Sequence, residues 1–336
     1  MVERSTHQGA DEIGTVSVVI PTRDRRASLD RILASLLGER GLKEVIVVDD
    51  NSADDTAAHV QALAGEFPAL RLIRTSGVGP SLARAAGAAA ATGEVVLFVD
   101  DDVVGVPGFV EGHARWHRDD ENLIVCGYSP PVVSGRSSAV VRNLAHHYGA
   151  WVEAATADST QALFELWGLN MSIRRVDVRR VPPSVPEFEG CRSHEDREFG
   201  LRCLEAGMRG IVDVRLRADH FYTRTIKQFR LDMLEFGRGR VLLHHLHGDI
   251  LGPFSGDVLE PAARRFAAAI RVTDKPAWYR VITAALEAGV RLGDAARMPR
   301  LADWCLHGLA RIELRRGARV QAARLEAEVG FSGRAL

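Results

Sequence analysis

The first half of the chain alternates between two hydrophobic periodicities. Short runs rich in Val and Ile predict buried strands over residues 15–20, 44–49, 70–75 and 94–99. Helical spacing separates these runs over residues 27–37, 54–64 and 81–91, with Asp54 and Ser81 as expected N-caps. Because strand–helix–strand units form right-handed crossovers, this pattern predicts an α/β fold with a mostly parallel sheet flanked by helices.

The second half carries fewer regular signals. Residues 123–127 predict one further strand, whereas residues 127–189 are expected to be irregular because proline pairs interrupt them. Helical patterns follow over residues 195–206, ended by Gly207, and over residues 227–247. Beyond Gly252 the chain is rich in Ala, Arg and Leu, which predicts a helical C-terminal extension.

Composition narrows the class of protein. The formal net charge of the 336 residues is −1, so bulk charge gives no reason to expect a nucleic-acid partner. The four cysteines form no CxxC pair, and reduced thiols are typical of the cytoplasm. The first 14 residues do not resemble a signal peptide, and no run reaches the roughly 18 apolar residues of a membrane-spanning helix. We therefore expect a cytoplasmic protein without a transmembrane segment.

Polar side chains gather after three of the predicted strands. Thr22 and Arg23 follow the first strand, Asp49 and Asp50 the second, and residues 100–102 (DDD) the fourth. Ligands of parallel sheets bind beyond the carboxyl ends of the strands, so these groups should share one rim. Adjacent carboxylates repel one another unless a cation neutralises them, and hard oxygen ligands suit Mg²⁺ or Mn²⁺ and hence a diphosphate. The alternative is a solvated acidic turn.

The order of the motifs resembles that of family 2 glycosyltransferases, which have the GT-A fold. The matching segments are residues 18–25 (VVIPTRDR), 47–52 (VVDDNS), 79–87 (GPSLARAAG), 98–102 (FVDDD), 168–175 (GLNMSIRR) and 194–196 (HED). The third segment has Ala85 and Ala86 where the family often has Asn. The resemblance covers about residues 15–240, and it includes the family's metal-binding DxD strand and its ED helix.

The resemblance implies a role for each matching residue. The donor nucleotide would contact Pro21, Thr22, Arg23, Asp50, Arg84, Asp100 and Asp101. A divalent metal, Mg²⁺ or Mn²⁺, would bind Asp100, Asp102 and His220. Asp196 would be the catalytic base with Glu195 in support, and Asn170 and Trp167 would contact the donor sugar or the acceptor. Asp50 would accept a hydrogen bond from the base, most naturally the N3–H of uracil.

The chemistry agrees with these roles. An acceptor hydroxyl must lose its proton as it attacks the anomeric carbon, and a carboxylate within reach can accept that proton. Glu195 and Asp196 are neighbours on a helix and point about 100° apart, so only one of them can face the acceptor. One base without a nucleophile gives inversion of configuration. The expected enzyme is a metal-dependent, inverting glycosyltransferase that uses a UDP-sugar.

Two other functions stay open at this point. A nucleotidyltransferase also uses a metal on an α/β sheet, but no Gly-rich triphosphate loop follows Ile20. A non-catalytic nucleotide-sugar-binding protein would not need the acid set. Neither the donor sugar nor the acceptor is readable, and saccharides, lipids, peptides and small natural products all remain open. His244, His245 and His247 are expected to form a solvated face rather than a metal cluster.

The expected domain organisation follows from the same pattern. Residues 1–14 would be a flexible N-terminus, and residues 15–250 a GT-A domain with a nucleotide-binding half (15–127) and an acceptor-binding half (128–250). Residues 251–336 would be the helical C-terminal region. This region either packs on the catalytic domain, forms a homodimer contact, or docks on the inner face of an anionic membrane through Arg311, Arg315, Arg316 and Arg319.

Overall fold

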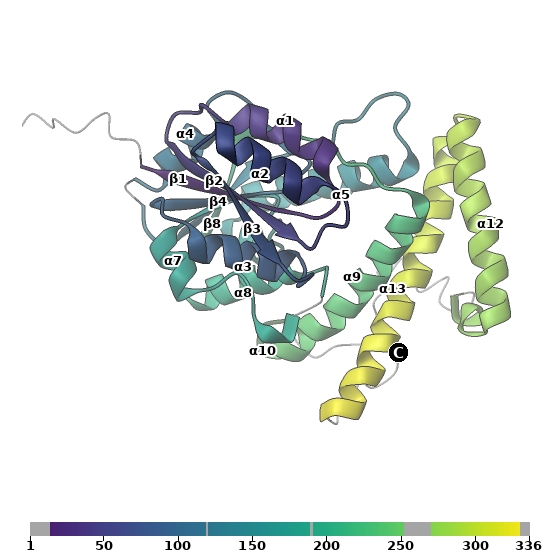
Figure 1. Ribbon diagram of the computed structural model, residues 1–336. Helices are drawn as coiled ribbons and strands as arrows, with labels where there is room; N and C mark the ends of the chain where they lie inside the picture. The colour runs from purple at the N-terminus through teal and green to yellow at the C-terminus, as the bar shows by residue number, and fades with distance from the viewer. Residues whose placement is uncertain (1–13, 119, 189–190, 252–269, 330–336) are drawn as a thin grey trace, which may run out of the picture.

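A central mixed sheet organises the molecule (Figure 1). The structure, a computed structural model, describes residues 14–118, 120–188, 191–251 and 270–329. The sheet has eight strands in the order β3-β2-β1-β4-β7-β6-β8-β5. Their bounds are β1 Val16–Thr22, β2 Leu42–Asp50, β3 Leu70–Thr75, β4 Val95–Val99, β5 Val103–Gly105, β6 Leu123–Tyr128, β7 Asn170–Arg174 and β8 Arg209–His220.

The four N-terminal strands form the predicted parallel half of the sheet. β1 pairs in parallel with β2 and β4, and β2 pairs in parallel with β3. Three helices connect them: α1 Arg26–Leu36, α2 Thr56–Glu66 and α3 Pro80–Ala90. β4 is buried along its whole length, as expected for a strand covered on both faces. The carboxyl ends of β1, β2 and β4 therefore lie at one edge, which we call the rim.

Helix α3 packs very closely on the sheet. This packing places the first turn of α3 at the rim. A Cβ atom at Gly87 would overlap the side chain of Val19 on β1, which only glycine avoids. The predicted cap at Ser81 is wrong: the N-cap is Gly79, with φ +91°, and the Ser81 hydroxyl donates to the Pro183 carbonyl. Asp54 also misses the N-cap of α2, which is Asp55, although its carboxylate accepts from the Thr56 amide.

The sheet continues through strands of opposite direction. β7 pairs antiparallel with both β4 and β6, whereas β6 and β8 pair in parallel. β5 closes the sheet antiparallel to β8. α4 Phe109–Trp116 connects β5 to β6 and packs against β8.

The expected irregular segment 127–189 is in fact largely regular. It contains α5 Ala139–Ala157, α6 Ser159–Phe164, β7, α7 Arg175–Arg180 and the short 3₁₀ helix Pro186–Phe188. The proline pairs lie between these helices and strands and not within them. They therefore mark where elements end and do not indicate an irregular segment. The 12-residue strand β8 was also unpredicted, although every second or third of its residues is buried, as at the edge of a sheet.

Long helices form a layer beside the sheet. α8 Glu195–Glu205 is followed by Gly207 in the left-handed region (φ +75°), as predicted. α9 Ile226–Leu246 begins with a capping box of Thr225 and Gln228. α10 Gly248–Leu251, the 3₁₀ helix Val272–Asp274, α12 Pro276–Ala295 and α13 Pro299–Val329 complete the described chain.

The C-terminal helices pack against the rest through a tight crossing. Cβ atoms at Gly237 of α9 or Gly317 of α13 would overlap the carbonyl oxygen of Leu314 or Leu234 on the other helix. Helix α12 lies on the outer side of α13, away from the sheet (Figure 1). Among the described helices, none is long and apolar enough to cross a membrane.

Candidate active site

Arg84 connects two acidic groups that lie far apart in the sequence. Its guanidinium, on the buried face of α3, lies 2.7 Å from the Asp100 carboxylate at the end of β4. It also lies 3.1 Å from Asp196 and 3.5 Å from Glu195 in the first turn of α8. Burial alone would lower the pKa of Arg84, but these carboxylates raise it above its ordinary value. One cation thus holds together the strand-end acid and both acids of the ED motif.

The two acids of the ED motif differ in their exposure. Asp196 accepts hydrogen bonds from Arg84 and from the Gly168 amide (2.9 Å), and 27% of its side chain remains exposed. The Glu195 side chain is only 11% exposed. Burial raises the pKa of both carboxyls, and Asp196 raises that of Glu195 further, while Arg84 opposes the shift. Asp196 is therefore the acid that an outside hydroxyl can reach.

The other two strand-end acids face different partners. Asp101 is held by the Thr22 hydroxyl at 2.7 Å, and burial together with the Asp102 charge raises its pKa to about 7. Asp102 lies 3.2 Å from the His220 Nε2 and 3.7 Å from Arg25. Burial would raise the pKa of Asp102, but the hydrogen bond and charge of His220 lower it. The structure thus pairs Asp102 with His220, the last residue of β8.

Asp50 organises the loop that begins α3. Its carboxylate accepts from the Thr75 hydroxyl (2.6 Å), the Val78 amide (2.7 Å) and the Gly79 amide (2.9 Å). Burial would raise the pKa of Asp50, but these donors lower it. The Gly77 amide is a further donor to this carboxylate and also lowers its pKa. The structure places Asp50 at the rim, where it shapes the turn that carries Arg84.

Arg23 and Pro21 lie at the end of β1. Pro21 is half-buried and Arg23 exposed, and the Arg23 side chain approaches Gly77 in the β3–α3 loop. The segments that follow β1 and β3 therefore approach each other at the rim, past the end of β2.

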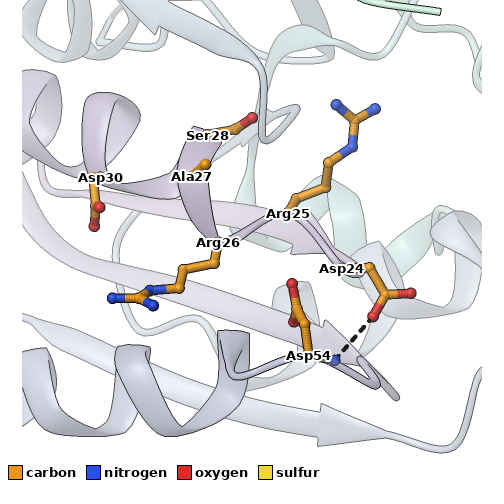
Figure 2. Close-up of a pocket in the computed structure, with 7 residues that line it drawn as sticks. All are labelled: Asp24, Arg25, Arg26, Ala27, Ser28, Asp30 and Asp54. Atoms are coloured by element: carbon orange, nitrogen blue, oxygen red, sulfur yellow. Dashed lines mark hydrogen bonds between the residues drawn. The ribbon is translucent and has the colours of Figure 1, made fainter.

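A pocket of about 440 Å³ lies next to the rim (Figure 2). Asp24 there accepts from the Asp54 amide, and Arg25 and Arg26 extend to opposite sides. The lining residues are Asp24, Arg25, Arg26, Ala27, Ser28, Asp30 and Asp54. None of the predicted site residues lines it, and Arg25, which approaches Asp102, is its link to the rim.

Asn170 and Trp167 lie under the rim, in contact with other protein groups. The Asn170 amide donates to the Ser129 hydroxyl and the Leu216 carbonyl, and its oxygen faces His113 at 2.9 Å. It is 1% exposed. Trp167 is half-buried and stacks on Trp151 with ring centroids 5.9 Å apart. Contact of either residue with a sugar stays a prediction.

A family comparison decides the class of protein. Residues 17–173 match the family model described as glycosyl transferase family 2. Over these residues, just under half of the chain, the sequence is similar to a family 2 glycosyltransferase domain.

Curated relatives match parts of this chain. The uncharacterised glycosyltransferase YfnE of Bacillus subtilis is 30% identical over 113 residues, 33% of this chain and 29% of that protein. The dolichol-phosphate mannosyltransferase of Pyrococcus furiosus is 35% identical over 94 residues, 27% of each chain. Each alignment thus spans less than a third of the relative's own length.

Solved structures extend the likeness in fold. The mannosyltransferase PcManGT from Pyrobaculum calidifontis, in complex with GDP-Man and Mn²⁺, superposes with a TM-score of 0.56 at 18% identity. That match covers 95% of this chain and 88% of the other. S. aureus TarS 1–349, in complex with UDP, gives 0.50 at 17% identity, covering 95% and 93%. The chain therefore has the GT-A fold.

The donor atoms at the rim fit a divalent ion. Asp102 offers a carboxylate and His220 an imidazole nitrogen 3.2 Å away, and Mn²⁺ accepts both ligand types. Asp100 faces Arg84 instead, and no group of three or more His, Cys, Asp or Glu ligands is present among the described residues. Two protein ligands suffice where a diphosphate supplies further oxygens.

Sequence reasoning missed several residues that shape this site. Arg25 beside Asp102 ends the matched segment 18–25 but was given no role, and Thr75 beside Asp50 belongs to no recognised motif. Gly168 lies within the matched segment 168–175, but its contact with Asp196 depends on two elements 28 residues apart. The histidine prediction is wrong for His247, which is 8% exposed and lies 3.2 Å from the buried Glu198.

Proposed function

We propose that the chain is a divalent-metal-dependent, inverting glycosyltransferase that transfers a sugar from a UDP-sugar to an acceptor nucleophile. The Arg84 contacts carry this proposal, because they join the strand-end acid Asp100 to the ED-motif acid Asp196 at one rim. The GDP-Man and Mn²⁺ of PcManGT and the UDP of TarS support a nucleotide donor. Residues 15–127 would bind the nucleotide and residues 128–250 the acceptor.

The nucleotide would rest on the ends of β1, β2 and β4. Pro21, Thr22 and Arg23 would line its pocket, and Asp50 would accept a hydrogen bond from the uracil N3–H. Asp100 and Asp101 would contact the ribose side of the donor, and Asn170 and Trp167 would support the sugar. Since Thr22 already fixes Asp101, this part of the rim is prepared before donor binds.

Asp196 would act as the general base. Its exposed carboxylate edge can accept the proton of an acceptor hydroxyl as the hydroxyl attacks the anomeric carbon. The Gly168 amide and Arg84 fix its orientation. Glu195 is too buried to serve as a second reacting carboxylate and would hold Arg84 in place. With one carboxylate at the acceptor, the displacement is single and inverts the anomeric centre.

Asp102 and His220 would hold the divalent ion, Mg²⁺ or Mn²⁺. When bound, such an ion stabilises the negative charge that develops on the leaving diphosphate. The lowered pKa of Asp102 keeps this carboxylate ionised and ready to bind a cation at neutral pH.

Calorimetry of nucleotide binding tests the proposal. We expect UDP to bind more tightly than GDP or dTDP, and we expect Mn²⁺ to be required. Asp102→Asn should abolish the metal dependence, whereas Asp219→Asn, at a partly exposed residue next to His220 on β8, should not. Metal-independent binding of UDP would contradict the metal site, and no binding of any nucleotide by folded protein, with or without candidate acceptors, would contradict the glycosyltransferase activity.

A further inference from the structure

Helix α12 presents an exposed apolar stripe to solvent. Trp278, Val281 and Leu292 are 52%, 60% and 61% exposed, and they recur at heptad spacing. The positions between them in this register are alanines, at 285, 288 and 295, and all are exposed. These positions span the length of α12, a helix that lies on the outer side of α13 (Figure 1). The turn that follows adds Met298, 52% exposed.

The acidic residues on and around α12 are paired with arginines of the protein. Asp274 pairs with Arg315 and Arg319 of α13, and Glu287 pairs with Arg230 of α9. Asp294 and Asp303 both pair with Arg142 of α5. Two of the arginines that the sequence suggested for membrane contact, Arg315 and Arg319, therefore form ion pairs within the fold. Their charges cannot make α12 a basic surface.

A different set of basic residues surrounds the stripe. These residues are exposed and have no ion pair among the described residues: Arg271, Lys275, Arg280, Arg297 and Arg300. Arg280 borders the stripe along α12, whereas Arg297 and Arg300 flank Met298 in the turn. The whole chain has a net charge of −1, so this positive surface is a local feature and does not follow from composition.

The charges favour an anionic partner over a second copy of the chain. Two copies of α12 that paired antiparallel around Ala285 and Ala288 would bring arginines of both stripes toward each other, without an acidic residue to meet them. Apolar and aromatic side chains bordered by arginine and lysine instead match the interface of an anionic bilayer, where each basic residue contributes about 1 kcal/mol.

We propose that the α12 stripe and its basic border form a docking surface for an anionic lipid bilayer. Helix α12 lies in the plane of the headgroups, with Trp278, Val281 and Leu292 turned toward the acyl chains. Arg280, Arg297 and Lys275 contact lipid phosphates. This surface is separate from the rim and requires neither donor nor acceptor.

Vesicle sedimentation of the full chain tests the docking surface. We expect binding to vesicles that contain phosphatidylglycerol, weaker binding at high salt, and little binding to pure phosphatidylcholine. Arg280→Gln/Arg297→Gln/Arg300→Gln should weaken partitioning at least tenfold. Trp278→Ser should weaken it and should also remove part of the blue shift of tryptophan fluorescence that vesicles cause. All of these residues are exposed, so thermal melts should be unchanged.

A control on the far side of the molecule separates docking from general charge. Val176 and Arg179 on α7 are also exposed, and Val176→Ala/Arg179→Gln should leave vesicle binding unchanged. Equal binding to neutral and anionic vesicles would overturn the proposal. The proposal would also be overturned if the chain did not bind vesicles and instead formed a dimer that Trp278→Ser dissociates. Helix α12 would then be a contact between two copies of the chain.

Discussion

Two carboxylate networks lie at opposite ends of the parallel strands, and they are built differently. At the amino ends, Glu44 is 5% exposed and accepts hydrogen bonds from Ser17, Thr92 and Arg71. Burial would raise the pKa of Glu44, yet these donors lower it to about 2. At the rim, Asp196 and Glu195 share the single guanidinium of Arg84 with Asp100, and their pKa values are raised.

The difference shows that the supply of donors, and not burial alone, sets the state of a carboxyl. The amino-end network is saturated and contains no acceptor site for a ligand, as expected of a part that holds the sheet together. The acids at the rim have fewer hydrogen-bond donors around them. Their carboxylates therefore keep unused acceptor sites and can bind protons or cations. We expect mutations at the two ends to separate stability from activity.

The largest effect is expected from Asp196→Asn at the rim. The amide cannot accept the proton of the acceptor, so turnover should fall by about 10²- to 10⁴-fold. Arg84 retains Asp100 and Glu195 as partners, so the free energy of unfolding should change by less than about 1 kcal/mol. Steady-state kinetics, UDP calorimetry and chemical denaturation measure these quantities. Full turnover in this variant would remove Asp196 as the base.

Glu44→Gln should have the opposite profile. The pKa of Glu44 falls from 4.5 to about 2 on folding, which corresponds to about 3 kcal/mol of stability at pH 7. Since the folded pKa is the lower one, this stability is present above about pH 4.5 and is lost as the pH falls toward 2. Urea unfolding at pH 7 should therefore show a loss of about 3 kcal/mol that shrinks in acid, with turnover nearly unchanged.

The exposed Glu94, at the neighbouring strand start, provides the control for Glu44. Glu94→Gln should cost less than about 0.5 kcal/mol. If both variants lose the same amount, the donors around Glu44 do not stabilise the fold in the way proposed.

His113 extends the comparison to a buried imidazole beneath the rim. Burial lowers its pKa to about 3, although the hydrogen bond to Asn170 opposes the shift. The unfolded chain takes up this proton near pH 6.5, so stability falls as the pH drops below that value. Between pH 7 and 5 the wild type should lose about 2 kcal/mol more than His113→Gln. The same difference for His245→Gln, at an exposed site, would show that the effect does not come from His113.

Gly168→Ala should give the smallest effect. The new methyl group would lie less than 3 Å from the Asp196 carboxylate and displace it. Because the reacting groups must be placed closely, we expect turnover to fall about tenfold with stability nearly unchanged. Gly135→Ala, where no atom lies within 4 Å, is the matched control. Equal turnover in both variants would mean that the position of Asp196 tolerates the shift.

The parallel half of the fold could be read from the sequence because its strands are buried on both faces. Uninterrupted Val and Ile runs gave β1, β2, β3 and β4 to within about two residues at each end. The GT-A fold followed from motif order and is confirmed, and residues 17–173 match the family 2 glycosyltransferase model that the motifs predicted. β8 and α5 were missed because their half-exposed surfaces mix polar and apolar residues, which weakens the periodic signal.

The sequence predicted which residues form the site but not which of them contact one another. Asp100, Arg84 and Asp196 were all named from motifs, yet which acids share Arg84 depends on how closely α3 packs on β1 through Gly87. The same holds for Asn170, whose motif suggested a ligand contact although its amide joins β7 to β8 through Leu216. Contacts between distant segments are set by three-dimensional packing that local sequence does not encode.

The glycine crossing of α9 and α13 has a mechanical consequence. The two backbones are in contact at the glycines, so a rotation or translation of one helix would make it clash with the other. We therefore expect α9 and α13 to behave as one rigid unit without a hinge between them. If α12 rests on a bilayer, this rigid unit fixes the height of the rim above the lipid surface. The geometry of these helices would then set the distance between the bilayer surface and the acceptor that reacts at the rim.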